Sequence, residues 1–108
     1  MVYTILEIQA IVSPIAQKYH LRAVYLFGSY ARGTATESSD VDLLIDTEGT
    51  EIKSLLDLSV VYCELEEALD KSVDLLTLIS FKQTAQMPSE TAFRDTVNRE
   101  RRILYAVA

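Results

Sequence analysis

The sequence predicts a single α/β domain in which helices pack against one face of a small mixed β-sheet. A helix-period apolar stripe runs through residues 3–19. Short apolar runs, typical of buried strands, lie at 23–27, 41–45 and 73–78. A chain of 108 residues can bury one modest core and is too short for a second substrate-binding domain. We therefore expect residues 1–108 to form one domain.

The composition is that of an ordinary globular chain, with 49% hydrophobic and 24% charged residues. A net charge of −6 argues against a protein that coats nucleic acid non-specifically, because such binding needs many cations facing phosphates. No apolar stretch approaches the length of a membrane span, and the first residues lack a signal-peptide pattern. We therefore expect a cytoplasmic protein. The single cysteine, Cys63, is expected to be buried in a helix.

The first predicted helix spans residues 3–19. Its stripe consists of Ile5, Ile8, Val12, Ile15 and Tyr19. Pro14 lies inside this stripe and removes a backbone donor, so we expect either a kink or a restart with Ser13 as cap. His20 follows the helix and has no second histidine to complete a metal set, so we expect it near the last helical carbonyls.

The stretch 26–46, LFGSYARGTATESSDVDLLID, predicts strand, turn, helical turn, loop and strand. Because side chains alternate along a strand, Asp40 and Asp42 should point the same way, roughly 6.5 to 7 Å apart. The core-facing residues of the second strand would then be Val41, Leu43 and Ile45. The sequence thus predicts two carboxylates side by side where a strand starts.

Like charges at this spacing repel, so the pair favours a bound cation. Mg²⁺ suits a site with few carboxylates, because it completes its coordination shell with water and substrate phosphates. Gly28 and Ser29 form a turn whose free N–H groups and hydroxyl can face a phosphate. Singly, these residues are more typical of an ordinary strand end and turn. Together they predict a nucleoside triphosphate site.

The residues Gly28-Ser29-Tyr30-Ala31-Arg32-Gly33 and Ser39-Asp40-Val41-Asp42-Leu43-Leu44 resemble the signature of the minimal nucleotidyltransferases, a branch of the DNA polymerase beta superfamily. The resemblance extends from the first helix through Leu104 and Tyr105. It implies the nucleotidyltransferase fold, with Gly28 and Ser29 holding the triphosphate. It also implies that Asp40 and Asp42 bind two Mg²⁺ ions together with a third carboxylate.

The third carboxylate is expected to be Asp74, in the strand-like run that follows the long helix. A carboxylate in an apolar strand is expensive to bury unless it is paired or bound to metal, which supports this assignment independently of the family. A cap, or an ion pair between Asp74 and Lys71, is the alternative. By contrast, Asp46 is expected in a loop, roughly 13 Å from Asp42 and too far to share its metal.

Arg32 could reach the triphosphate or the leaving group as a fixed guanidinium. Pairing with Glu37 or with a neighbouring helix is an equally good interpretation. The loop 33–39, rich in Thr, Ser and small residues, would lie over the site.

A long helix is predicted over residues 51–69, with Glu64, Glu66 and Glu67 on its solvated side. Its apolar face would consist of Ile52, Leu55, Leu56, Ser59, Val60, Cys63, Leu65, Ala68 and Leu69.

The last helix should start at Met87-Pro88-Ser89-Glu90 with Ser89 as cap. Its four arginines, Arg94, Arg99, Arg101 and Arg102, favour a solvated face with helix ion pairs from Glu90 to Arg94 and from Asp95 to Arg99. A patch for a partner or an RNA is the alternative. The run Ile103-Leu104-Tyr105 is expected to be a short strand or the last packed turn.

The acceptor of the nucleotide is not visible in the residues, because the chain has no extra domain to bind one. Proteins similar to it are commonly paired with a HEPN-domain ribonuclease toxin. The resemblance therefore implies an antitoxin that transfers AMP from ATP to a toxin tyrosine. A non-catalytic antitoxin that masks its toxin, and a subunit of a small-molecule nucleotidyltransferase, are the competing hypotheses. Three intact acidic residues, Asp40, Asp42 and Asp74, favour catalysis.

Overall fold

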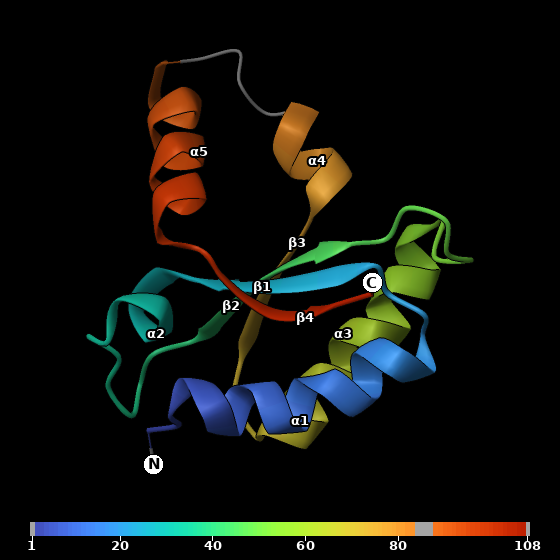
Figure 1. Ribbon diagram of the computed structural model, residues 1–108, viewed down its shortest axis with the longest axis horizontal. Helices are drawn as coiled ribbons and strands as arrows, with labels where there is room; N and C mark the ends of the chain where they lie inside the picture. The colour runs from blue at the N-terminus through green and yellow to red at the C-terminus, as the bar shows by residue number, and fades with distance from the viewer. Residues whose placement is uncertain (1, 84–87, 108) are drawn as a thin grey trace.

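The computed structural model describes residues 2–83 and 88–107 and shows an α/β domain (Figure 1). In chain order its elements are α1 (Ile5–Lys18), β1 (Ala23–Phe27), α2 (Gly28–Arg32), β2 (Val41–Asp46), α3 (Leu55–Leu69), β3 (Val73–Thr77), α4 (Leu78–Gln83), α5 (Pro88–Glu100) and β4 (Arg102–Ala106). The predicted order of strand, turn, short helix, loop and strand around the glycine turn is confirmed. None of the described helices is long and apolar enough to cross a membrane.

The four strands form one mixed sheet in the order β3-β2-β1-β4. Strand β1 pairs antiparallel with both β2 and β4, whereas β2 and β3 run parallel. Of the two predictions for Ile103 to Tyr105, a short strand or a packed turn, the strand is confirmed: it is β4, an edge strand. The other edge is β3, so the predicted buried strand at 73–78 is in fact only partly buried.

Helices cover both faces of this sheet, so the expectation of helices on one face is wrong. Below the sheet in Figure 1, α1 and α3 pack on the main core, which includes Val24, Leu26 and Leu43. Above it lies α5, whose Val97 packs on Phe27 and Leu44. Strand β2 thus has buried side chains on both sides. Strand alternation places Leu44 on the face opposite the predicted core, where the sequence alone suggests contact with solvent. Helix α5, which is far away in the sequence, covers that face.

Helix α1 begins with a capping box, in which the Thr4 hydroxyl accepts a hydrogen bond from the Glu7 N–H and the Glu7 carboxylate accepts one from the Thr4 N–H. Pro14 lies inside the helix without a restart, so Ser13 is not a cap. Its hydroxyl instead donates to the Gln9 carbonyl at 2.7 Å. His20 closes the helix through its backbone, which is left-handed at φ 56° and donates to the Gln17 carbonyl.

Helix α3 is shorter than predicted and buries only part of the predicted face. It begins at Leu55 after the cap Ser54, and its buried residues are Val61, Leu65 and Leu69. The predicted apolar face is only partly correct, because Leu55, Leu56 and Val60 are 85%, 76% and 52% exposed. Cys63 is also exposed, which corrects the prediction that it is buried.

Helix α5 begins at Pro88, so Ser89 lies within the first turn and is not the cap. Met87 and the side chain of Glu90 lie outside the described part of the chain, and with them the predicted Glu90–Arg94 pair. Arg99 bonds the main-chain oxygen of Asp95 and the Thr96 hydroxyl.

Candidate active site

Two of the three predicted carboxylates lie side by side on the sheet. Asp42 in β2 is paired in register with Asp74 in the parallel strand β3, and neighbouring strands are about 4.8 Å apart. The alternation along β2 puts Asp42 on the same face as Leu44, which α5 covers. Asp40 precedes β2 and is exposed. The structure thus brings Asp42 and Asp74 together at the start of two adjacent strands. Asp40 is the residue immediately before β2.

Glu66 of α3 fixes the start of β3 and hence the position of Asp74. Its Oε2 accepts hydrogen bonds from the Val73 N–H and the Tyr62 hydroxyl, both at 2.9 Å. Glu66 was expected on the solvated side of the helix, so this role is a correction. Asp74 itself is exposed, and the argument from its burial is therefore wrong. Its position opposite Asp42 is what supports its role.

Lys71, the alternative partner of Asp74, points elsewhere. Its ammonium donates to the main-chain oxygen of Glu37 at 2.8 Å and lies 5.9 Å from the centre of the Tyr30 ring. It therefore ties the loop 33–39 to the beginning of β3, beside the predicted site.

Gly28 lies directly against the side chain of Asp42. Its backbone is left-handed at φ +73°, and a Cβ placed on it would collide with Oδ2 of Asp42 and lie 2.9 Å from Cγ. Phe27, the residue before it, is the register partner of Asp42. Glycine is thus required here both for the turn and for the close approach of the carboxylate. Ser29 follows in the first turn of α2 and is half-buried.

The surroundings of Asp42 destabilise the ionised form of its carboxyl group. Its partial burial, and then the negative charges of Asp74 and Asp40, raise the pKa of Asp42 from 3.8 to about 6, while Arg32 opposes this shift. No hydrogen bond from a described residue offsets the repulsion. A bound cation would offset it.

These carboxylates fit Mg²⁺ as part of a coordination shell. Among the residues that the structure describes, no three acidic, histidine or cysteine side chains form a ready ligand set. Mg²⁺ usually takes only one or two protein carboxylates and fills the remaining positions with water and phosphate oxygens. The paired Asp42 and Asp74, with Asp40 close enough to perturb Asp42, match that requirement.

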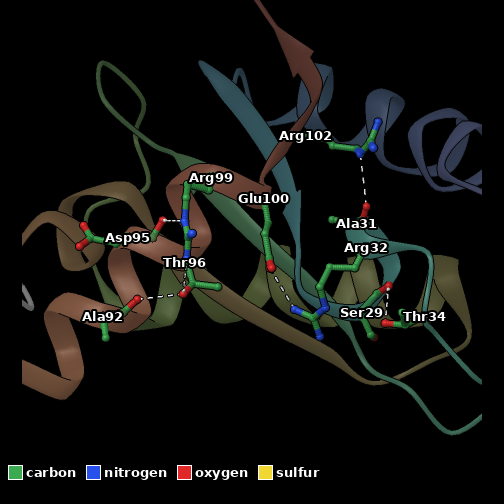
Figure 2. Close-up of polar contacts among 10 residues, drawn as sticks. All are labelled: Ser29, Ala31, Arg32, Thr34, Ala92, Asp95, Thr96, Arg99, Glu100 and Arg102. Carbon is green, nitrogen blue, oxygen red and sulfur yellow. Dashed lines mark hydrogen bonds and ion pairs between the residues drawn. The ribbon is translucent and has the colours of Figure 1, made fainter.

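Arg32 is held by a neighbouring helix, as one of its two interpretations predicted. Its Nη1 lies 3.0 Å from Oε2 of Glu100, the last residue of α5 (Figure 2). Its charge is still near enough to lower the pKa of Asp42. Arg32 therefore lies within electrostatic reach of the site while it also links α2 to α5.

Asp46 is not a loop residue, as was expected, but the last residue of β2. It is buried, accepts a hydrogen bond from the Glu48 N–H at 3.0 Å and lies 3.9 Å from Arg22 Nε. Its predicted separation from the metal site agrees with its place at the opposite end of the strand.

Sequence reasoning missed Glu66 and Glu100 as residues that support the site. Glu66 lies seven residues from its partner Val73, and Glu100 lies 68 residues from Arg32. Val73 lies in β3, beyond the end of α3, and Glu100 lies in a helix far from Arg32 along the chain, so no pattern within a single helix or strand could have indicated either residue.

Comparisons with known proteins identify the family of the chain. A family model described as polymerase beta, nucleotidyltransferase matches residues 9–105. The protein adenylyltransferase MntA of Thermococcus cleftensis is 37% identical over 98 residues, which cover 87% of this chain and 94% of that protein. A Methanocaldococcus jannaschii protein provisionally named a protein adenylyltransferase is 48% identical over 71 residues, covering 66% of this chain and 74% of that one.

Solved structures show the same fold. A protein provisionally described as a minimal nucleotidyltransferase has 30% identity and a TM-score of 0.64, with 93% of this chain and 95% of that chain covered. The match to a complex of tri-AMPylated Shewanella oneidensis HEPN toxin with its MNT antitoxin has 19% identity and a TM-score of 0.65, covering 96% and 74%. A toxin–antitoxin crystal structure with AMP-PNP has 22% identity and a TM-score of 0.69, covering 92% and 73%.

Proposed function

This chain belongs to the polymerase beta nucleotidyltransferase family and, within it, to the protein adenylyltransferases, and on that premise we propose its acceptor and its site. The proposed reaction transfers AMP from ATP to a tyrosine hydroxyl of a partner HEPN toxin, for which the chain is the antitoxin. Support for the partner comes from the similar fold of an MNT antitoxin in complex with a tri-AMPylated HEPN toxin. Support for ATP comes from the similar toxin–antitoxin structure with AMP-PNP.

One observation carries the proposal at the level of chemistry. Asp42 and Asp74 lie side by side on adjacent strands, and Asp42 lies against a glycine turn that leaves no room for a side chain. Carboxylates that repel and lack donors are poor structural elements, but they suit a site completed by Mg²⁺ and phosphates.

In the proposed mechanism, the N–H groups and hydroxyl of the turn at Gly28 and Ser29 bind the β- and γ-phosphates. Asp40, Asp42 and Asp74 would hold two Mg²⁺ ions, which when bound stabilise the attacking and leaving oxygens of an in-line displacement. Asp74 is exposed, and it takes up the phenolic proton as the tyrosine oxygen attacks. Pyrophosphate then leaves.

The test is incubation of the protein with ATP, Mg²⁺ and a candidate HEPN protein, followed by intact mass measurement of both chains. We expect the HEPN protein to gain the mass of one or more AMP groups and to lose ribonuclease activity. Loss of ribonuclease activity without any mass change would support the masking antitoxin instead. A mass change with chelator present would remove Mg²⁺ from the mechanism.

A further inference from the structure

Four arginines gather around a cavity at the edge of the sheet, where the last turns of α2 and α5 meet. The cavity has a volume of about 450 Å³ and is lined by Ala31, Arg32, Arg99, Glu100, Arg101 and Arg102. We name these residues the arginine pocket. The whole chain has only ten Lys and Arg residues and a net charge of −6. A concentration of positive charge in an acidic protein, beside its nucleotide site, calls for a ligand.

Internal contacts orient the arginines on the α2 side of the pocket. Arg102 Nε donates to the Ala31 carbonyl at 3.2 Å, and Arg32 pairs with Glu100 (Figure 2). A guanidinium has five N–H donors, so one or two contacts leave several donors for a ligand. These two side chains are thus preorganised without being saturated.

The two remaining arginines are held by α5 and by the sheet. Arg99 donates to the Asp95 carbonyl and the Thr96 hydroxyl, both at 3.4 Å. Arg101 lies over the Tyr25 ring, with its Cζ 4.5 Å from the ring centre. The Arg99 guanidinium thus folds back along α5, as Figure 2 shows, and its two long contacts hold it weakly, so it can turn toward an anion in the pocket.

Glu100 is the single carboxylate of the pocket and neutralises one of its four arginines. The remaining three positive charges suit a compact anion with several oxygens, and the planar guanidinium fork matches a phosphate best. The carboxylate of Glu100 now occupies a position on Arg32 for which such a phosphate would compete.

The pocket lies close to the place where the new phosphodiester forms. Gly28, beside Asp42, and Arg32, in the pocket, are the first and last residues of α2. At a rise of 1.5 Å per residue they are about 6 Å apart along the helix. A phosphate that leaves the metal site can therefore reach the pocket without a rearrangement of the domain.

We propose that the arginine pocket binds the phosphodiester of the adenylylated acceptor, which rests on the function proposed above. In the transfer, the tyrosine oxygen forms a bond to the α-phosphorus, the bond from that phosphorus to the bridging oxygen of the β-phosphate breaks, and pyrophosphate leaves. The phenolic proton passes to Asp74, and the acceptor now carries one negative charge where it had none. The pocket thus distinguishes the modified acceptor from the unmodified one and retains the product.

The test measures binding of O-adenylyl-tyrosine amide by calorimetry, in chelator so that the carboxylates hold no metal. Arg99→Gln should weaken binding about tenfold, because it removes one charged donor group. Glu100→Gln should strengthen binding, because it removes the competing anion. The matched control is Arg22→Gln, which changes the net charge equally but lies at the Asp46 end of the sheet and should leave binding unchanged. Thermal melts of all variants confirm folding.

Three outcomes would overturn the proposal. Equal affinities of the Arg99→Gln and Arg22→Gln variants would remove the pocket from product binding. A raised KM for ATP in Arg99→Gln would make the pocket part of the triphosphate site. Tighter, Arg99-dependent binding of a single-stranded oligoribonucleotide would make it a nucleic-acid site. Because the probe is synthetic, binding is measured even if the wild type transfers no AMP, so failure of the proposed function is recognised separately.

Discussion

The two ends of β2 carry the same side chain on the same face of the sheet, in very different surroundings. Asp46, at the end of β2 far from the candidate site, is buried. Its carboxylate accepts a hydrogen bond from the Glu48 N–H and lies near Arg22. Asp42, at the near end, is half-buried among other carboxylates, and its pKa is raised to about 6. The difference shows that residue type and strand position do not decide the role of a carboxylate. The role depends on whether hydrogen-bond donors surround the carboxylate.

Asp46 has the environment of a structural residue, because its charge is compensated within the protein. Asp42 has the environment expected of a ligand-binding residue, because burial and two neighbouring carboxylates raise its pKa and only Arg32 opposes them. Substitutions at the two ends should therefore separate activity from stability.

The largest expected effect is the loss of transfer in Asp42→Asn. The amide keeps the shape but removes the charge that a metal needs, so we expect the rate of AMP transfer to fall about a thousandfold or more. The measurement is the time course of the mass change on the HEPN partner. Binding of the partner should persist, because the exchange adds no bulk.

The matched variant at the far end is Asp46→Asn. It should keep transfer within a few-fold and lose roughly 1 kcal/mol of unfolding free energy, because the contacts with Glu48 and Arg22 are weakened. Full transfer by Asp42→Asn, or loss of transfer in Asp46→Asn at unchanged stability, would reverse the roles assigned to the two ends.

The next effect concerns the glycine beneath Asp42. In Gly28→Ala, the new methyl group occupies the place of the Asp42 carboxylate, whereas Gly33→Ala at φ +80° has nothing within 4 Å of its Cβ. Both pay about 1–2 kcal/mol for a left-handed alanine, so their difference isolates the contact with Asp42. We expect Gly28→Ala alone to reduce transfer, about a hundredfold. Equal rates in the two variants would show that the approach of Asp42 to Gly28 is not needed.

Much of the near end could be predicted from the sequence, because its signals are local. Gly28 ends one apolar run and Asp42 lies in the next, where strand alternation places it on one face of the sheet. Asp40 precedes this strand, so its expected position on the same face does not follow from strand alternation. Asp74 was found by its position after a helix, although the burial argument for it failed. Its exposure depends on β3 being the edge strand, and strand order is a property of the whole sheet.

The errors share a physical cause, which is packing between segments far apart in the chain. In α3 apolar residues occupy two sides, and only contact with α1 and the sheet decides that Val61 and Leu65 are buried while Leu56 and Cys63 are exposed. The second core, on the Asp42 face, needs Val97 of α5. No window of helix or strand length contains that information.

A smaller effect is the pH dependence of stability in chelator. The folded-state pKa of Asp42 is about 6 and its ordinary value is 3.8, so the folded protein binds more protons between these pH values. Stability should therefore fall as pH rises through this window. After solvent screening, the loss is roughly 1–2 kcal/mol. Asp42→Asn should lack this loss, so it should equal the wild type near pH 4 and exceed it at pH 7. Urea unfolding at both pH values measures this, and a variant less stable than wild type at pH 7 would make Asp42 structural.

The smallest effect concerns one hydroxyl at each end of the sheet. Ser29→Ala removes a proposed phosphate donor and should weaken ATP binding by roughly three- to tenfold, which is about 1 kcal/mol, while the unfolding free energy stays unchanged. Thr50→Ala at the far end removes a buried hydroxyl that donates to the Thr47 carbonyl and accepts from the Ile52 N–H, so it should lose stability and keep its affinity for ATP. The measurement is the shift in melting temperature on adding Mg²⁺ with ATP, which reports binding to the folded state. If Ser29→Ala showed the full shift, the phosphates would be bound by main-chain N–H groups alone. If Thr50→Ala lost the shift, the nucleotide would bind at the Asp46 end.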